Sequence, residues 1–165
     1  MKRNTADLIS PAGNPPDAGV VVRNRQRQEK INTPAAERFA AVALELMESQ
    51  AEVCFHLVSA REMARLNWQF LQHEGSTDVI TFDQGSAPGR LRGEIFISVA
   101  DAQAQAEEFG TTWQDELGRY MVHGLLHLAG YDDLQPSQRK IMKRLEERLM
   151  RQLRKCHPPA TFGGS

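Results

Sequence analysis

Hydrophobic residues follow two different periods along this chain, and the change from one to the other predicts the order of its elements. Continuous or alternating apolar runs, typical of strands, occupy residues 19–24, 51–58, 78–82 and 93–99. Apolar residues three or four positions apart, as on one helix face, occupy residues 34–49, 60–70, 100–109, 113–128 and the stretch from 136. This order predicts an α+β fold, with a mixed four-stranded sheet and about five helices packed on it in a single domain.

Capping and turn signals mark the ends of these elements. Thr33 before Pro34 predicts a helix start with Thr33 as the cap, and Ser59 with Glu62 forms a capping box. The last helix has apolar residues at every fourth position, which predict its buried stripe: Ile141, Leu145, Leu149 and Leu153. The two ends of the chain lack such patterns. We therefore expect a flexible N-terminal arm over 1–18, a folded domain over 19–156 and a flexible tail over 157–165.

Composition narrows the possible classes of protein. A length of 165 residues suits one domain, and a formal net charge of −1 gives no global argument for a nucleic-acid partner. No apolar run in the sequence is long enough to cross a bilayer, and because no apolar stretch follows Lys2 and Arg3 we expect no signal peptide. Its two cysteines, Cys54 and Cys156, do not make a disulfide framework. We expect a cytoplasmic protein in which Cys54 is a buried thiol.

Residues 123–133, HGLLHLAGYDD, carry the strongest chemical signal. His123 and His127 lie about 40° apart around a helix and about 6 Å apart along it, so both imidazoles reach one ion. Gly130 is expected to end the helix and turn the chain, which returns Asp132 and Asp133 toward the same place. Two histidines and a carboxylate, with a fourth position open, form the ligand set of a catalytic zinc ion.

Three other interpretations of residues 123–133 fit this pattern less well than a hydrolytic zinc site. Two core histidines satisfied by hydrogen bonds are the plain structural alternative, although an apolar helix rarely buries two polar rings without a partner. A non-haem iron oxygenase also uses two histidines and a carboxylate, but a third ligand just beyond the helix end fits hydrolytic zinc better. A zinc peptidase of the HExxH type needs a glutamate immediately after the first histidine, and this chain has Gly124 there.

The same segment resembles the motif HGxLHLxGYDH of the YbeY family of bacterial endoribonucleases and matches every fixed position except the last. Two upstream pieces occur in the family's order. Leu66-Asn67 precedes residues 77–82, TDVITF, which are similar to the family's TDVLSF, and residues 93–98, GEIFIS, are similar to its GDIxIS. The resemblance extends over roughly residues 19–155.

The resemblance implies a sheet with helices packed on it and a metal-dependent, single-strand-specific endoribonuclease. Such an enzyme acts in late rRNA maturation and ribosome quality control, with single-stranded rRNA and the small ribosomal subunit as partners. By position, one zinc ion is expected on His123, His127 and Asp133, with Asp132 as the competing carboxylate.

This chain departs from the family pattern at two positions. Asp133 replaces the family's third histidine, which adds a negative charge and should weaken the ion as a Lewis acid. Leu71 occupies the place of a cleft arginine four residues after the asparagine, so a cation that offsets charge on the phosphate is missing. The possible substitutes for it are Arg65, Arg90 and Arg92.

The sequence leaves the proton-transfer residue open. Asp132 and Asp78 are the acidic candidates, and each also suits a structural role, in the case of Asp78 as a cap shared with Thr77. Glu116, on the same helix face as His123, either orients an imidazole or is a solvated acid of the first helical turn.

Charge is segregated along the chain in a way that bears on RNA binding. Residues 94–117 contain acidic but no basic residues, whereas basic residues gather in 139–155 and again in 23–30. Such a basic run either binds phosphates or is a solvated face.

The leading hypothesis from the metal motif and the resemblance is a metal-dependent RNA hydrolase. The alternative is a ribosome-assembly factor with a mainly structural metal and little nuclease activity, which Leu71 and Asp133 favour.

Overall fold

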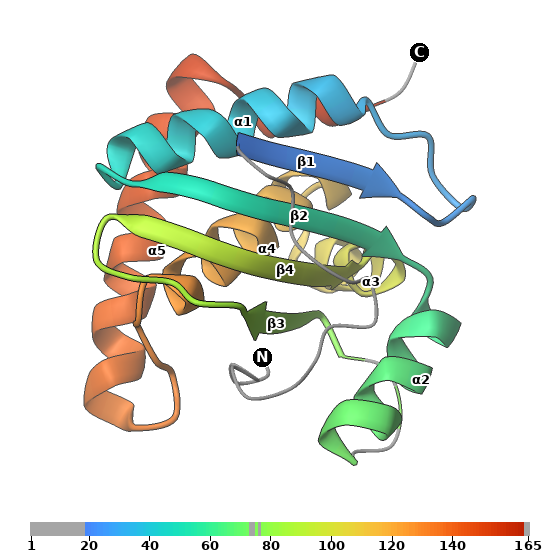
Figure 1. Ribbon diagram of the computed structural model, residues 1–165. Coiled ribbons are helices and arrows are strands. Elements are labelled where there is room, and N and C mark those ends of the chain that lie inside the picture. The colour runs from blue at the N-terminus through green and yellow to red at the C-terminus, as the bar shows by residue number, and fades with distance from the viewer. Residues whose placement is uncertain (1–18, 73–74, 76, 164–165) are drawn as a thin grey trace.

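The computed structural model describes residues 19–72, 75 and 77–163, and these form one four-stranded sheet with helices on both faces (Figure 1). The strands are β1 (Gly19–Asn24), β2 (Gln50–Val58), β3 (Val79–Asp83) and β4 (Arg90–Ser98). Their order in the sheet is β1-β2-β4-β3; β1, β2 and β4 are parallel, and β3 is antiparallel to β4. The predicted α+β fold with a mixed four-stranded sheet is confirmed.

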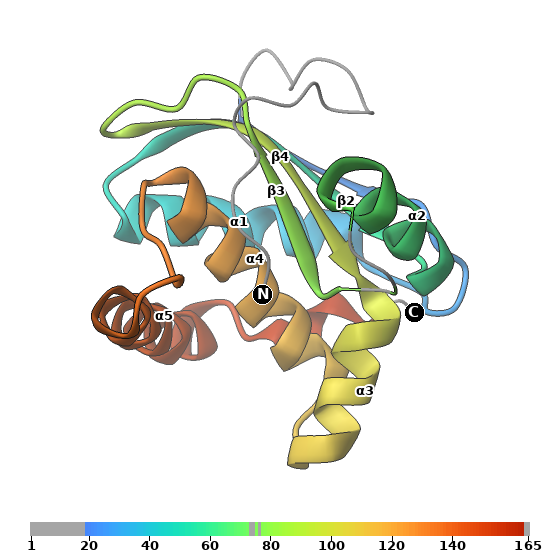
Figure 2. The ribbon, with the colours of Figure 1, turned by 90° about the horizontal axis from the view of Figure 1, so that it is seen from below.

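Five α-helices and one short 3₁₀ helix surround the sheet. They are α1 (Thr33–Leu46), α2 (Ala60–Leu71), α3 (Val99–Phe109), α4 (Trp113–Leu128), α5 (Pro136–Cys156) and the 3₁₀ helix η1 (Pro159–Phe162). In Figure 2 the sheet separates α2 from α1, α4 and α5, so the two faces have different covers. We call the face that carries α4 the inner face and the opposite one the outer face. None of the helices in the described segments has the length and apolarity needed to cross a bilayer.

The larger core lies on the inner face, between the sheet and α1, α4 and α5. Residues of α4 are buried from Leu117 to Leu128 with one exception, Arg119, so this helix is enclosed on nearly all sides. A smaller apolar cluster lies under α2 on the outer face and includes Met63, Leu66 and Phe82. The helix that carries the two histidines is therefore the central helix of the protein, which fixes their position.

One predicted helix cap is wrong, and the predicted buried stripe of the last helix holds only in part. The cap of α1 is Asn32 rather than Thr33; its side chain accepts a hydrogen bond from the Ala35 amide at 3.1 Å, because Thr33 and Pro34 already occupy the first helical turn. In α5, Leu149 and Leu153 of the predicted stripe are buried and Leu145 is partly buried against the core, but Ile141 is 51% exposed. The residues of α5 that are buried are Met142, Glu146, Leu149, Met150 and Leu153.

The expected flexible tail is structured over the part that is described. η1 buries Phe162, whose ring meets that of Phe39 edge-on at a centroid distance of 5.0 Å, and Gly163 forms a β-bridge with Ile31. The burial of Phe162 helps to hold this segment, since burying a phenylalanine contributes about 1.5–3 kcal/mol. The expected arm over residues 1–18 lies outside the described residues.

Candidate metal centre

The turn after α4 returns the chain toward the histidines. Gly130 has φ +100°, its amide donates to the carbonyl of His127 at 3.0 Å, and the Tyr131 amide donates to that of Leu126 at 3.0 Å. This pair of bonds is a Schellman motif, which needs a residue with positive φ after the cap and so favours glycine. The predicted helix stop at Gly130 is confirmed, and the reversal places the next residues beside the last turn of α4.

Three side chains meet at this helix end. The Nε2 atoms of His123 and His127 are 3.0 Å apart, and Asp133 has one carboxylate oxygen 3.4 Å from the first and the other 3.7 Å from the second. Ligand atoms about 2.0–2.2 Å from a tetrahedral zinc ion lie roughly 3.3–3.5 Å from one another. Both histidines are buried, and Asp133 is partly exposed. The three donors therefore fit around one ion with a side left open.

Asp132 lies outside this group of donors. The described residues bring His123, His127 and Asp133 within reach of a common ion, and Asp132 is not part of that set. Its Oδ1 accepts a hydrogen bond from the Leu134 amide at 2.9 Å, which forms a local turn. Of the two adjacent carboxylates, the geometry favours Asp133 as the ligand.

The electrostatics keep a histidine lone pair available. Burial lowers the pKa of His127, the neighbouring His123 lowers it further, and the Asp133 carboxylate opposes the shift. At neutral pH the His127 ring is thus in its neutral form, which is the form that binds metal ions.

Glu146 on α5 holds the other side of His123, and the sequence analysis missed this residue. Its Oε2 is 3.2 Å from His123 Nδ1, and its other oxygen accepts from Arg119 at 3.4 Å. A carboxylate on Nδ1 fixes the ring so that Nε2 points at the ion. The available signal was its position: Glu146 is four residues after Met142 and three before Leu149, on the buried stripe of α5.

The comparisons with known proteins decide the family. A family model described as "Endoribonuclease YbeY" matches residues 21–154. The chain belongs to the YbeY family. An endoribonuclease YbeY from Bacteroides thetaiotaomicron is 41% identical over 101 residues, covering 60% of this chain and 72% of that protein. One from Parabacteroides distasonis is 34% identical over 128 residues, covering 74% of this chain and 89% of that protein.

A solved structure supports the same fold. The solution structure of TM1509 from Thermotoga maritima matches with a TM-score of 0.59 and 26% identity, covering 86% of this chain and 95% of that one. The resemblance drawn from residues 66–67, 77–82, 93–98 and 123–133 is thus confirmed at the level of the family.

Leu71, which occupies the place of the family's cleft arginine, does not face the metal centre. It packs with Phe70 against the apolar cluster under α2, on the outer face. The three arginines considered as substitutes are also engaged elsewhere. Arg90 and Arg92 pair with Glu52, and Arg65 lies beside Gln69 and Glu62 on α2.

Two basic residues of α5 lie near the candidate ligands. A cavity of about 420 Å³ opens beside His123 and Asp133, and its wall includes Arg139 and Lys143 of α5, Arg119 of α4 and four acidic residues. Arg139 Nε also donates to the backbone carbonyl of Asp133 at 3.2 Å, which ties the ligand loop to the first turn of α5. The basic run expected in the last helix therefore reaches the site through residues in the first turns of α5.

The other acidic candidates have local roles. Asp78 accepts hydrogen bonds from the Val79 amide at 2.8 Å and the Thr77 hydroxyl at 3.4 Å, as expected of a cap at a strand entry. Glu116 is buried and accepts from the Thr111 hydroxyl at 2.9 Å, so it is neither a partner of His123 nor a solvated acid. No proton-transfer residue is assigned by these contacts.

Gly124 explains why the peptidase pattern does not fit this helix. A Cβ added at Gly124 lies 2.7 Å from Cγ2 and 2.9 Å from Cδ1 of Ile95, on the inner face of β4. The position where an HExxH enzyme carries its glutamate is here pressed against the sheet, with no room for a side chain.

We expect Gly124→Ala to destabilise the fold by up to about 2 kcal/mol, because overpacking costs about 1–3 kcal/mol and the helix propensity of alanine returns about 1 kcal/mol of it. Denaturant unfolding measures the free energy. In an Ile95→Ala background the opposing atoms are gone, and the same substitution should become neutral or stabilising. Equal destabilisation in both backgrounds would contradict the contact.

We expect Glu146→Ala to weaken zinc binding about 10–100-fold, since the His123 ring loses the carboxylate that orients it. Competition with a chromophoric chelator measures the affinity. Glu147→Ala is the matched control, because Glu147 pairs with Arg119 but does not contact His123. Similar losses in both variants would show that the pairing with Arg119, rather than the contact with His123, sets the affinity.

Proposed function

We propose that this chain is an endoribonuclease that cleaves single-stranded RNA with one divalent ion, zinc by preference, on His123, His127 and Asp133. The observation that carries the proposal is the convergence of these three donors, 3.0–3.7 Å apart, beside a cavity with basic residues in its wall. Family membership supports the same reaction class, because the curated relatives are named endoribonucleases. When bound, such an ion supplies an activated water and neutralises charge on a phosphate oxygen.

The protein's own groups have distinct parts in this proposal. Glu146 holds the His123 ring, and the Schellman turn holds Asp133 beside the two imidazoles. Arg139 and Lys143 bind phosphate oxygens of the RNA from α5, in the place of the arginine that Leu71 replaces. Asp132 and Asp78 remain the acidic candidates for proton transfer.

The substrate and location are part of the same proposal. We propose rRNA in late maturation, on the small ribosomal subunit, as the RNA, in keeping with the family resemblance. A cytoplasmic location is supported by the two cysteines, Cys54 and Cys156, which are both free thiols as a reducing compartment keeps them.

The test is cleavage of a labelled single-stranded RNA by the purified full chain, with added zinc and with a chelator. We expect cleavage with zinc, loss of cleavage with the chelator, and resistance of the same sequence when it is annealed into a duplex. Cleavage that persists unchanged in the chelator would refute a metal-centred reaction.

A second function is favoured by two specific residues. Leu71 removes the family's cleft arginine, and Asp133 adds negative charge to the ligand set. Both changes suit a ribosome-assembly factor whose metal mainly stabilises the fold. This alternative predicts that Asp133→Ala still sediments with the small ribosomal subunit, and that the wild-type chain cleaves no RNA at any zinc concentration.

A further inference from the structure

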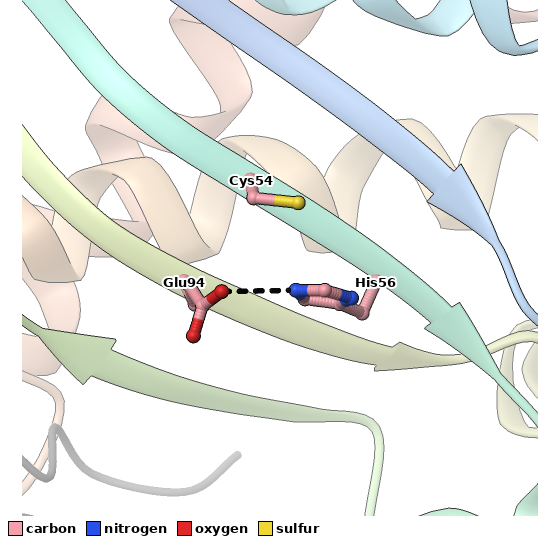
Figure 3. A group of neighbouring side chains, drawn as sticks. All are labelled: Cys54, His56 and Glu94. Carbon is pink, nitrogen blue, oxygen red and sulfur yellow. Dashed lines mark hydrogen bonds and ion pairs between the residues drawn. The ribbon is translucent and has the colours of Figure 1, made fainter. Parts of the chain in front are cut away.

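A second group of potential metal ligands lies on the opposite face of the sheet. Cys54 and His56 alternate on β2, so their side chains share one face, and Glu94 is the residue of β4 that pairs with Cys54 (Figure 3). The residue after Glu94, Ile95, faces α4 at Gly124. Glu94 therefore points to the outer face, away from His123 and His127, and the sheet stands between the two groups.

The three side chains of this outer-face cluster converge. His56 Nε2 is 3.2 Å from Glu94 Oε1, and one donor atom from each of Cys54, His56 and Glu94 lies within 4.8 Å of the other two. The residues are 3%, 3% and 1% exposed. Cysteine sulfur, histidine nitrogen and carboxylate oxygen are all ligand atoms of structural metal sites.

We propose that Cys54, His56 and Glu94 form a second metal site, which binds a borderline divalent cation such as Zn²⁺ or Co²⁺. The donor set selects the class of ion, because a thiolate and an imidazole suit these ions, whereas Mg²⁺ and Ca²⁺ prefer all-oxygen sites. Ligands of a tetrahedral zinc ion lie roughly 3.3–3.6 Å apart when one is sulfur. His56 Nε2 and Glu94 Oε1, 3.2 Å apart, are close to this spacing, and the Cys54 ligand atom, within 4.8 Å of both partners, would move closer on binding.

An unsatisfied carboxylate oxygen points to a cation. Glu94 Oε2 is buried and has no hydrogen-bond partner among the described residues, and the same holds for His56 Nδ1. A buried acceptor left without a partner is destabilising, and more so when it is charged. An ion held through Glu94 would offset that destabilisation at the carboxylate.

The charges around Cys54 act in opposite directions on its thiol. Burial raises the pKa of Cys54, while the guanidinium of Arg23 lowers it by a hydrogen bond and by its charge. Metal ions bind the thiolate, so binding displaces the thiol proton. This site is independent of the proposed nuclease centre, because the two share no ligand and lie on opposite faces.

A structural role for the cluster predicts a different result. His56 stacks on Phe96 at a ring-centroid distance of 4.5 Å, so a plain ion pair with Glu94 within the outer-face packing would need no metal. Such a pair leaves Cys54 as an inert buried thiol that adds nothing to metal binding.

The test is titration of the metal-free full chain with Co²⁺, because cobalt bound to a thiolate gives an intense near-ultraviolet charge-transfer band that histidine and carboxylate ligands do not give. We expect two equivalents and the band in the wild type. Cys54→Ser should bind one equivalent without the band, whereas Cys156→Ser, which alters the exposed cysteine, should match the wild type.

Two more variants make the result decisive. His127→Ala removes a donor of the inner-face centre and should keep the thiolate band, so failure of the nuclease proposal and failure of this one are distinguishable. Glu94→Gln keeps the thiol and the side-chain volume. It should weaken the Co²⁺ affinity measured from the band at least tenfold, which tests the site even if Cys54→Ser does not fold. Absence of the band in the wild type, or its loss only in Cys156→Ser, overturns the proposal.

Discussion

Replacing His127 with alanine should lower RNA cleavage by about 1,000-fold, because one of three metal ligands is lost and with it several kcal/mol of transition-state stabilisation. The measurement is single-turnover cleavage of a single-stranded RNA at saturating zinc. His127 is buried within α4, so each preparation is checked by circular dichroism and thermal melting to separate lost chemistry from lost fold.

Two matched variants sharpen this expectation. His157→Ala removes a histidine beyond the end of α5 and should leave cleavage unchanged. Asp133→His restores the ligand that the family uses at this position, and should retain metal and cleave at least as fast as the wild type, since a neutral ligand leaves the ion a stronger Lewis acid. Equal cleavage by the wild type and His127→Ala would exclude the proposed metal centre from the reaction.

Removing the cations of the cavity should have the next largest effect. We expect Arg139→Ala and Lys143→Ala each to lower kcat/KM about 10–100-fold, because a hydrogen bond to a charged group contributes about 1.5–3 kcal/mol. Each variant should also reduce the slope of log affinity against log salt concentration by about one. Fluorescence anisotropy with a labelled RNA at several salt concentrations measures that slope.

The two cations differ in a way that separates phosphate binding from loop support. Arg139 also donates to the carbonyl of Asp133, so its loss can displace a ligand, whereas no such contact is described for Lys143. Arg139→Ala should therefore weaken zinc binding as well, and Lys143→Ala should not. Arg151→Ala is the control, since Arg151 is exposed and lies about 18 Å along α5 from Arg139 and about 12 Å from Lys143. A loss at Arg151 equal to that at Lys143 would indicate a diffuse electrostatic surface rather than a phosphate site.

The sequence predicts the elements where one local signal dominates. The apolar run within 19–24 predicts β1 with its observed ends, and the spacing of His123, His127 and Gly130 predicts a helix, its stop and the convergence of donors. These features depend on neighbours within a few residues, whose geometry is nearly fixed by helix and turn rules. Spacing alone does not decide between Asp132 and Asp133 as the third ligand. The family motif favours Asp133, because that residue stands at the motif's third ligand position.

Features that depend on distant contacts were missed. Glu146 meets His123 across 23 residues, and its charge made it resemble the solvated positions of α5. The burial of Phe162 depends on Phe39, far away in the chain, so the composition of the Pro- and Gly-rich segment 157–165 predicts flexibility instead. The role of Arg139 and Lys143 depends on how α5 crosses α4, which no pattern within either helix determines.

The missing side chain at Gly124 has a consequence for how this scaffold can change over time. Because the helix backbone rests directly on Ile95, any larger residue there forces the histidine-bearing helix away from the strand, and the first ligand moves with it. A lineage that acquired glutamate at this position would disturb the two histidines before it could gain a new activity. The scaffold is thus closed to peptide hydrolysis of the HExxH type by that single change.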